Sequence, residues 1–337
     1  MVGDVLTGAY AQLATLVQEP PRGDEWVHEA KLDGYRIFAH IARSSVKLFT
    51  RNGNDWTDRL ARVAEAVATL DLGDCLLDGE VCAVADDGRT DFQLLQNALG
   101  ATDTRIVYYV FDLLVLRGQD VRARPLLERK QLLKKALGRR CTESDAPVRY
   151  NEHVVGRGDA LFAQACKLGL EGIVSKRGDA PYRAGRGSDW LKIKCTGRQE
   201  FVIVGFTEPS GSRQHFGALL VATRKGSRLV YAGKVGTGFA RSSLADLARK
   251  LAPLRCKSAP VDVERFSIGL VGITWVEPKL VAEIEYSEIT RDGLLRHPVF
   301  RGLREDKPAK EVKREVPKRI GRLAQPARPG RIVSHKK

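Results

Sequence analysis

The sequence lacks any run of apolar residues long enough to cross a membrane as a helix. Such a span needs about 18 or more consecutive apolar residues, and no stretch of the 337 residues reaches that length. The N-terminus also lacks the charged-then-apolar layout of a secretory signal. These two absences argue against a membrane-spanning or exported protein and predict a location in the cytosol.

Cysteine and histidine are scarce, and neither type is spaced as metal ligands are. The six cysteines form no Cys-x-x-Cys pair and no zinc spacing, and the six histidines show no ligand pattern. Because disulfides are rare in the cytosol, all six thiols are expected to be reduced: Cys75, Cys82, Cys141, Cys166, Cys195 and Cys256.

Positive charge, by contrast, is abundant. The chain carries 56 Lys and Arg residues against 41 Asp and Glu residues, a formal net charge of +15. Residues 308–337 hold ten Lys and Arg and two Glu, so this segment contributes +8 and the remainder of the chain +7. A surplus of this size favours a polyanionic partner, nucleic acid first and an anionic membrane surface second.

The length of the chain and the change of pattern along it indicate two domains. Residues 1–196 are expected to form an α+β domain with antiparallel hairpins. Apolar and alternating runs predict its strands at residues 26–30, 37–41, 46–50, 75–84, 106–116 and 172–176. Apolar periodicity predicts one helix that starts near residue 57 or 58, and two more at 125–137 and 160–168.

The pattern changes after about residue 195. Short apolar runs separated by glycine-rich turns predict strands at residues 201–206, 218–223, 229–232 and 281–286, with one helix at 243–251. About five strands and a single helix suit a small closed barrel, so an OB-fold β-barrel is expected over residues 197–309. Residues 310–337 are rich in Pro, Lys and Arg, and are expected to form a disordered basic tail.

One dense group of charged residues lies at Glu29-Ala30-Lys31-Leu32-Asp33-Gly34-Tyr35-Arg36. A lysine at the end of a strand, a tight Asp-Gly turn and an arginine place cation, carboxylate and cation around one small space. Asp-Gly turns flanked by charges are also common in ordinary hairpins, so this octet alone does not establish a catalytic site.

Further motifs follow the octet in a fixed order. They are Arg51-Asn52-Gly53, Asp78-Gly79-Glu80, Tyr109-Val110-Phe111-Asp112-Leu113-Leu114, Glu171-Gly172-Ile173-Val174-Ser175-Lys176, Trp190-Leu191-Lys192-Ile193-Lys194 and Arg304-Glu305-Asp306-Lys307. With the octet, this ordered set resembles motifs I, Ia, III, IIIa, IV, V and VI of the covalent nucleotidyltransferases, the superfamily of ATP-dependent ligases and mRNA capping enzymes. A single match is weak, but seven in the right order are specific.

The resemblance is closer to the ligase domain of the bacterial end-joining ligases of the LigD type. It opens at Leu13-Ala14-Thr15-Leu16-Val17, and it closes with Trp275-Val276-Glu277-Pro278 and the run Leu295-Arg296-His297-Pro298-Val299-Phe300-Arg301-Gly302-Leu303-Arg304. The match covers roughly residues 12 to 307. It implies an N-terminal adenylation (nucleotidyltransferase) domain, a C-terminal OB-fold, and sealing of DNA nicks with ATP and a divalent cation, Mg²⁺ or Mn²⁺.

The resemblance also implies which residues carry the chemistry. Lys31 is the nucleophile that attacks the α-phosphate of ATP, and Asp33 orients the nick or its 3′-hydroxyl. Lys192 and Lys194 hold the α-phosphate; two lysines spaced i, i+2 on a strand point to the same side, so both can face one phosphate. The catalytic set expected is therefore Lys31, Asp33, Lys192 and Lys194.

Nucleotide and metal ligands follow from the same resemblance. Phe111 is expected to stack on adenine, although its place in an apolar run also fits a core residue. Arg304 and Lys307, with Asp306, are expected to orient pyrophosphate from the second domain, which implies a hinge near residues 194–198. The nucleotide-binding set is Glu29, Arg36, Arg51, Glu80, Phe111, Lys176, Arg304 and Lys307. The metal ligands expected are Glu171 and Glu80, because Mg²⁺ favours carboxylate and phosphate oxygens.

Alternatives remain open at this point. The same superfamily contains RNA ligases and capping enzymes that use GTP, and a non-catalytic DNA-binding protein could keep the fold. A ligase acting on nicked double-stranded DNA could serve double-strand-break end joining with Ku, or act alone in repair. A monomer is the expected oligomeric state.

Overall fold

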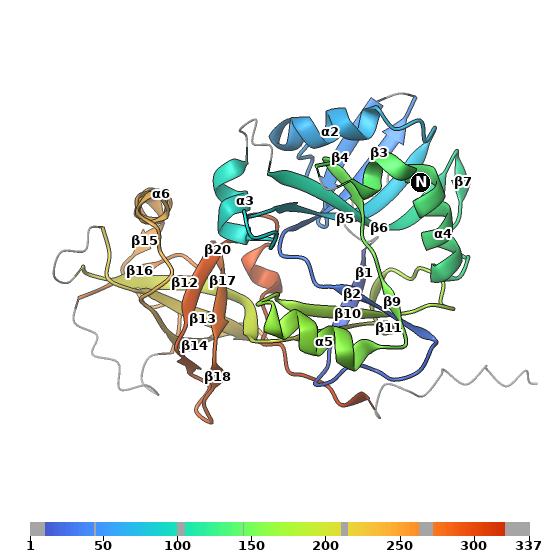
Figure 1. The fold of residues 1–337 in the computed structure, drawn as a ribbon. Helices are drawn as coiled ribbons and strands as arrows, with labels where there is room; N and C mark the ends of the chain where they lie inside the picture. The colour runs from blue at the N-terminus through green and yellow to red at the C-terminus, as the bar shows by residue number, and fades with distance from the viewer. Residues whose placement is uncertain are drawn as a thin grey trace, which may run out of the picture.

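The computed structural model describes residues 11–43, 45–99, 105–143, 145–209, 215–262 and 272–320. Within these stretches the chain forms two parts, the first coloured blue to green and the second yellow to red in Figure 1. Both are built mainly of antiparallel sheets with helices outside them, which confirms the predicted α+β class. None of the helices in the described stretches has the length and apolar character to span a membrane.

The first part contains two sheets. One sheet has the order β4 (Ser45–Thr50), β3 (Tyr35–Ala42), β5 (Cys75–Ala83), β6 (Ile106–Leu116) and β7 (Gln119–Asp120), with β8 (Val148–Tyr150) paired parallel to β6. The other has the order β1 (Gln12–Leu16), β11 (Gly185–Lys194), β10 (Gly172–Arg177), β2 (Trp26–Ala30) and β9 (Val154–Val155). The α-helices of the first part are α2 (Ala61–Ala68), α3 (Phe92–Ala98), α4 (Leu126–Leu137) and α5 (Gly158–Lys167). Its 3-10 helices are η1 (Asp58–Leu60) and η2 (Arg139–Thr142).

The alternation in β3 decides how the first sheet packs. Tyr35, Ile37, Ala39 and Ile41 all point to one face and are buried in the main core of this part. Helix α2 covers that core with Val63 and Val67, four residues apart on one face. The opposite face of the sheet carries Phe38 and Phe111, which pack toward the second sheet. The site described below lies between the two sheets.

The second part is a closed barrel. Its elements are β12 (Gly197–Thr207), β13 (Leu219–Lys225), β14 (Arg228–Val235), α6 (Arg241–Leu251), η3 (Ala252–Leu254), β15 (Arg255–Cys256), β16 (Ile273–Val276), β17 (Val281–Tyr286), β18 (Glu288–Ile289), β19 (Leu295–Arg296) and β20 (Val299–Leu303). Strand β12 pairs with β13 and β17, β13 pairs with β14, and β17 pairs with β20. A parallel bridge between Thr237 and Val299 closes the circuit. This strand order is that of the expected OB-fold.

Two elements at the junction of the parts were not predicted, namely α3 and β20. Helix α3 has only seven residues, too few for its apolar period to stand out. It begins where the Asp91 side chain accepts a hydrogen bond from the backbone N–H of Leu94, at 2.8 Å. Helix α3 packs directly against β20, as Figure 1 shows. These two short elements therefore form one of the contacts between the two parts.

The expectation of a disordered tail from residue 310 is wrong for its first eleven residues. The 3-10 helix η4 (Ala309–Glu311) follows β20, and Val312 is completely buried in the second part. The chain then crosses to the first part, where Lys318 bridges Val17. Isolated apolar residues within a basic segment give no periodic signal, which is why the sequence did not reveal this packing. The expected tail beyond residue 320 lies outside the described residues.

The cysteine prediction is wrong for one pair. Cys166 and Cys195 form a disulfide across 29 residues and join the end of α5 to the residue after β11. Cys75, Cys82, Cys141 and Cys256 are free. Two cysteines 29 residues apart carry no spacing signal, because only the packing of α5 against β10 and β11 brings them together.

Removal of this disulfide is expected to lower the free energy of unfolding by about 3 to 4 kcal/mol, since it closes a loop of some 30 residues in the unfolded chain. Cys166→Ser should show this loss in urea unfolding without reductant, and wild type should show it when reductant is added. Cys256→Ser, which alters a free thiol, is the matched control and should respond as wild type does. Equal stability of wild type and Cys166→Ser without reductant would contradict the prediction.

Candidate active site between the two sheets

Lys31 lies at the end of β2, where the backbone holds it in place. Its N–H donates to the carbonyl of Gly172 at 2.9 Å, extending the pairing between β2 and β10. Its Nζ donates to Glu171 Oε2 at 2.5 Å. Gly172 has a φ of 149°, and a Cβ at this position would collide with the backbone oxygen of Ile193. Glycine therefore lets β10 approach β11 closely, and so puts Glu171 beside Lys31.

Glu171 is nearly completely buried between two lysines. Its Oε1 lies 3.2 Å from Lys194 Nζ but accepts no hydrogen bond. Burial alone would raise the pKa of this carboxyl, but the positive charges of Lys31, Lys194 and Arg198 hold the pKa well below its usual range. Glu171 is therefore an ionised carboxylate at neutral pH.

Arg198, on β12, is the main residue of the site that sequence reasoning missed. Its guanidinium makes two hydrogen bonds to Asp33, at 2.8 and 2.7 Å, and its Nε donates to Glu283 Oε1 at 3.1 Å. Burial raises the pKa of Asp33 to about 6, with Glu171 and Glu283 adding to the rise and Arg198 opposing it. The only sequence signal for Arg198 was its place within the expected hinge.

Lys192 and Lys194 are close enough to influence each other on β11. Lys192 Nζ donates to both carboxylate oxygens of Glu315, each at 2.8 Å. Burial, together with the charge of Lys194, lowers the pKa of Lys192 to about 8, while Glu315 acts in the opposite direction. Burial also disfavours the charged form of Lys194, but the adjacent Glu171 prevails and the pKa of Lys194 is raised.

A cavity of about 120 Å³ opens beside Lys31 between the two sheets. It brings together seven of the predicted residues: Glu29, Lys31, Arg36, Glu80, Phe111, Lys176 and Lys192. Phe111 is 8% exposed and lines the cavity, so it is both a core residue and part of the cavity wall. Lys176 Nζ lies 4.1 Å from the centre of the Phe111 ring and 4.2 Å from that of Trp190.

Two charged residues that line this cavity, Glu29 and Arg36, are hydrogen-bonded to other side chains of the protein. Glu29 is buried and accepts hydrogen bonds from Lys130 at 2.6 Å, Lys176 at 2.7 Å and Asn151 at 3.0 Å. Arg36 donates to both oxygens of Asp78, at 2.8 and 2.6 Å. The charges of Glu29 and Arg36 are thus already balanced within the protein. Lys130, Asn151 and Asp78, the partners of these two residues, were not predicted.

Glu80, at the cavity edge, is the second carboxylate expected to bind metal. Burial raises its pKa to about 7, although the charge of Lys31 acts against the rise and that of Glu171 adds to it. Within the described stretches no three or more His, Cys, Asp or Glu side chains converge as a metal site. Glu80 and Glu171 offer hard oxygen atoms, and one oxygen of Glu171 accepts no hydrogen bond. This pair fits a divalent cation that completes its coordination with phosphate oxygens and water.

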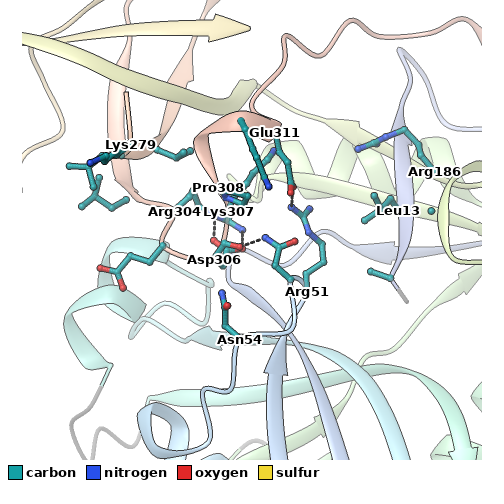
Figure 2. A pocket seen from close by; sticks show the side chains of 18 of the residues that line it. Leu13, Arg51, Asn54, Arg186, Lys279, Arg304, Asp306, Lys307, Pro308 and Glu311 are labelled. Carbon is teal, nitrogen blue, oxygen red and sulfur yellow. Dashed lines mark hydrogen bonds and ion pairs between the residues drawn. The ribbon is translucent and has the colours of Figure 1, made fainter. Parts of the chain in front are cut away.

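The predicted residues Arg51, Arg304 and Lys307 lie apart from this cavity. They line a larger one of about 940 Å³, together with Asp306 (Figure 2). Arg304 donates to Asp306 at 2.9 and 2.8 Å and to Glu283 Oε2 at 2.9 Å, while Lys307 Nζ lies 3.2 Å from Glu200. The positive charge of Arg304 nevertheless opposes the rise in the pKa of Glu80 that burial causes.

Hydrogen bonds hold the barrel against the first part. The Tyr35 hydroxyl donates to the Leu303 carbonyl at 3.3 Å, and Gln93 donates to the Gly238 carbonyl at 2.7 Å. The Arg304 guanidinium lies 5.4 Å from the ring centre of Tyr35. Arg304 is therefore docked against the first part beside Tyr35.

Comparison with known proteins gives consistent matches over both parts. The family described as "ATP dependent DNA ligase domain" matches residues 9–194, and that described as "ATP dependent DNA ligase C terminal region" matches residues 212–307. The "Multifunctional non-homologous end joining protein LigD" of Pseudomonas aeruginosa is 46% identical over 310 residues, which are 91% of this chain and 36% of that protein. A "DNA ligase" of Natronomonas pharaonis is 31% identical over 344 residues, 96% of this chain and 59% of that protein.

A solved structure supports the same comparison. The structure described as "mycobacterial DNA ligase D complexed with ATP and MES" is 34% identical, has a TM-score of 0.65, and covers 90% of this chain and 98% of its own. The chain spans little more than a third of the length of the LigD protein from Pseudomonas aeruginosa.

Proposed function

Because the chain belongs to the ATP-dependent DNA ligase family, we propose that it seals breaks in double-stranded DNA through AMP attached covalently to Lys31. One observation carries this proposal: Lys31 Nζ is held at 2.5 Å by the ionised carboxylate of Glu171, at the edge of the cavity lined by Glu80, Phe111 and Lys192. A nucleophile, an orienting group and phosphate-binding cations are thereby gathered at one place.

In the first step the Lys31 amine attacks the α-phosphorus of ATP. The N–P bond forms, the bond to the pyrophosphate oxygen breaks, and the proton that the amine loses passes through Glu171, its hydrogen-bond partner, to water. Glu171 orients the amine through its hydrogen bond, which keeps the lone pair directed at the phosphorus. Lys192 and Lys194 offset the charge that develops on the phosphate oxygens. Phe111 and Trp190 form an apolar wall that suits the adenine ring.

In the later steps AMP passes to the 5′-phosphate of the nick, and the 3′-hydroxyl then displaces it. Asp33 is the group assigned to orient that hydroxyl, but Arg198 occupies both of its oxygens in this arrangement. The barrel carries Arg198, so movement of the barrel about residues 194–198 frees Asp33. The arrangement described here therefore suits the first step, and an opened one suits the steps on DNA.

A divalent cation is assigned to Glu80 and Glu171, with Mg²⁺ and Mn²⁺ both fitting their oxygen atoms. When bound, the cation would offset phosphate charge and act as a Lewis acid beside the α-phosphate. Glu171 would then serve both the cation and Lys31, which its two oxygens permit.

The roles of the two domains and the cellular role of the protein are also proposals. Residues 1–196 are assigned as the adenylation domain and 197–309 as the OB-fold domain that clamps DNA. The likeness to LigD supports a role in non-homologous end joining. We further propose that the protein acts as a monomer in the bacterial cytosol, with Ku as a partner. The net charge of +15 supports salt-dependent binding to DNA phosphates.

Covalent labelling tests the proposal. The protein, first treated with pyrophosphate to remove any AMP already bound, is incubated with a divalent cation and ATP labelled at the α-phosphate. Label should remain on the denatured protein and map to the peptide with Lys31, whereas ATP labelled at the γ-phosphate should leave none. Addition of a duplex with one 5′-phosphate nick should discharge the label and seal the nick, and a 5′-hydroxyl nick should do neither. A protein that never takes label overturns the proposal.

The affinity for ATP should depend on pH through Lys192, whose pKa is about 8. The protonated ammonium, which binds phosphate, prevails below that pH and is lost above it. The KM for ATP in lysyl-AMP formation is therefore expected to rise by up to about tenfold between about pH 7 and pH 9. Lys192→Arg stays charged throughout and should show a flat KM. An equal rise in both proteins would contradict this assignment.

A further inference from the structure

The segment Ala309–Ile320, named here the C-terminal strap, ties the barrel to the first part. Ala309 and Val312 are buried in the barrel, and the N–H of Arg224 donates to the Val312 carbonyl at 3.0 Å. At its other end the N–H of Lys318 donates to the Leu16 carbonyl at 2.9 Å. Ile320 packs on the core beneath β1 and β11. Figure 1 shows this orange-to-red segment leaving the barrel and running across the first part.

Midway along the strap, Glu315 reaches the active site. Its carboxylate accepts two hydrogen bonds of 2.8 Å from Lys192, and its N–H donates to Gln199 Oε1 at 3.2 Å. Arg186 lies 4.0 Å from the same carboxylate. Lys192 also lines the cavity beside Lys31. The strap therefore holds a lysine of the proposed phosphate site by a pair of anionic oxygens.

We infer that the C-terminal strap is autoinhibitory: the Glu315 carboxylate occupies Lys192 in place of a phosphate, and ATP must displace it. The inference rests on the proposed role of Lys192 in binding the α-phosphate. A carboxylate and a phosphate both present two anionic oxygens to an ammonium, and Lys192 cannot direct its hydrogen bonds fully to both at once. The strap thus raises the apparent Kd for ATP in inverse proportion to the fraction of molecules in which Lys192 is free.

The same segment couples ATP binding to the position of the barrel. One end of the strap is buried in the barrel and the other is bonded to the first part. Release of Glu315 removes the charged contact in the middle of this connection, and leaves Lys318 as the hydrogen-bonded attachment to β1. A change that loosens the Lys318 attachment should therefore act in the same direction as loss of the Glu315 charge.

The test compares variants of the full chain in lysyl-AMP formation at varied ATP. Glu315→Gln keeps the shape of the side chain and removes its charge, while Lys318→Pro removes the N–H that bonds to Leu16. At about pH 6, well below the pKa of Lys192, each is expected to lower the KM for ATP by about three- to tenfold, with the rate at saturating ATP unchanged. The two substitutions change net charge in opposite directions, so a shared decrease cannot be a general charge effect. Glu288→Gln, in the exposed β18–β19 hairpin, makes the same charge change as Glu315→Gln and should leave KM unaltered.

An unchanged or raised KM in Glu315→Gln overturns the inference, and so does a Lys318→Pro variant that behaves as wild type. Both results leave the proposed function standing, because wild type still takes label. If wild type takes no label, the proposed function fails, but equilibrium binding of ATP still decides the inference. In the Lys31→Ala background, tighter ATP binding on adding Glu315→Gln supports competition at Lys192, and equal binding overturns it.

Discussion

Lys31→Ala is expected to abolish covalent uptake of AMP, a fall of more than about 10⁴-fold, because removal of the group that forms a covalent intermediate leaves no alternative route. Lys194 also contacts Glu171, at 3.2 Å, but it cannot substitute for Lys31. It belongs to β11 rather than β2, and its Nζ also donates to the backbone carbonyl of Arg198. The nearest remaining amine is therefore held away from the position of the nucleophile.

The fold should survive this change. The Lys31 side chain is 21% exposed, and its backbone contact with Gly172 does not depend on the side chain. Glu171 keeps Lys194 as an ionic partner, so no isolated buried charge results. Lys47→Ala, an exposed lysine on β4, is the matched control and should label as wild type. Label on Lys31→Ala at the wild-type level would disprove the assignment of the nucleophile.

Loss of the Glu171 charge is expected to have the next largest effect. Glu171→Gln should slow lysyl-AMP formation by about 10²- to 10⁴-fold, the range found for residues that assist proton transfer. The amide preserves the volume of the side chain but removes the negative charge shared by Lys31 and Lys194. It also removes one of the two carboxylates assigned to the divalent cation. Single-turnover rates with labelled ATP measure the effect directly.

The control for Glu171→Gln separates chemistry from folding. Glu152→Gln alters an exposed carboxylate that pairs with Lys134 on the surface, and should have a normal rate. Sealing of DNA supplied with AMP already on its 5′-phosphate should be reduced less than the first step, since that reaction bypasses Lys31. If Glu171→Gln labels at the wild-type rate, Glu171 neither orients the amine nor holds an essential cation.

Many of the longer strands and helices followed from local pattern. The alternation at residues 37–41 predicts β3, and the leucines at 125–137 predict α4. Burial of one face of each element imposes these periods, so they can be recognised in the sequence before the tertiary structure is known. The seven-residue α3 shows the limit of this reasoning: its apolar residues are too few to define a period.

The sequence by itself determined the family and led to the proposed chemistry, because the order of motifs around Lys31, Glu171 and Lys192 is specific and each motif is short. Tertiary structure alone decided which charges meet, Arg198 with Asp33 and Glu315 with Lys192, and which cysteines pair, Cys166 with Cys195. Arg198 is 165 positions from Asp33, and Glu315 is 123 positions from Lys192. Contacts over such separations arise when the barrel and its strap pack on the first part, and no periodicity or spacing encodes them. The sequence therefore specified the proposed reactive groups, while the docking of the two parts decided which of them are held by an internal partner.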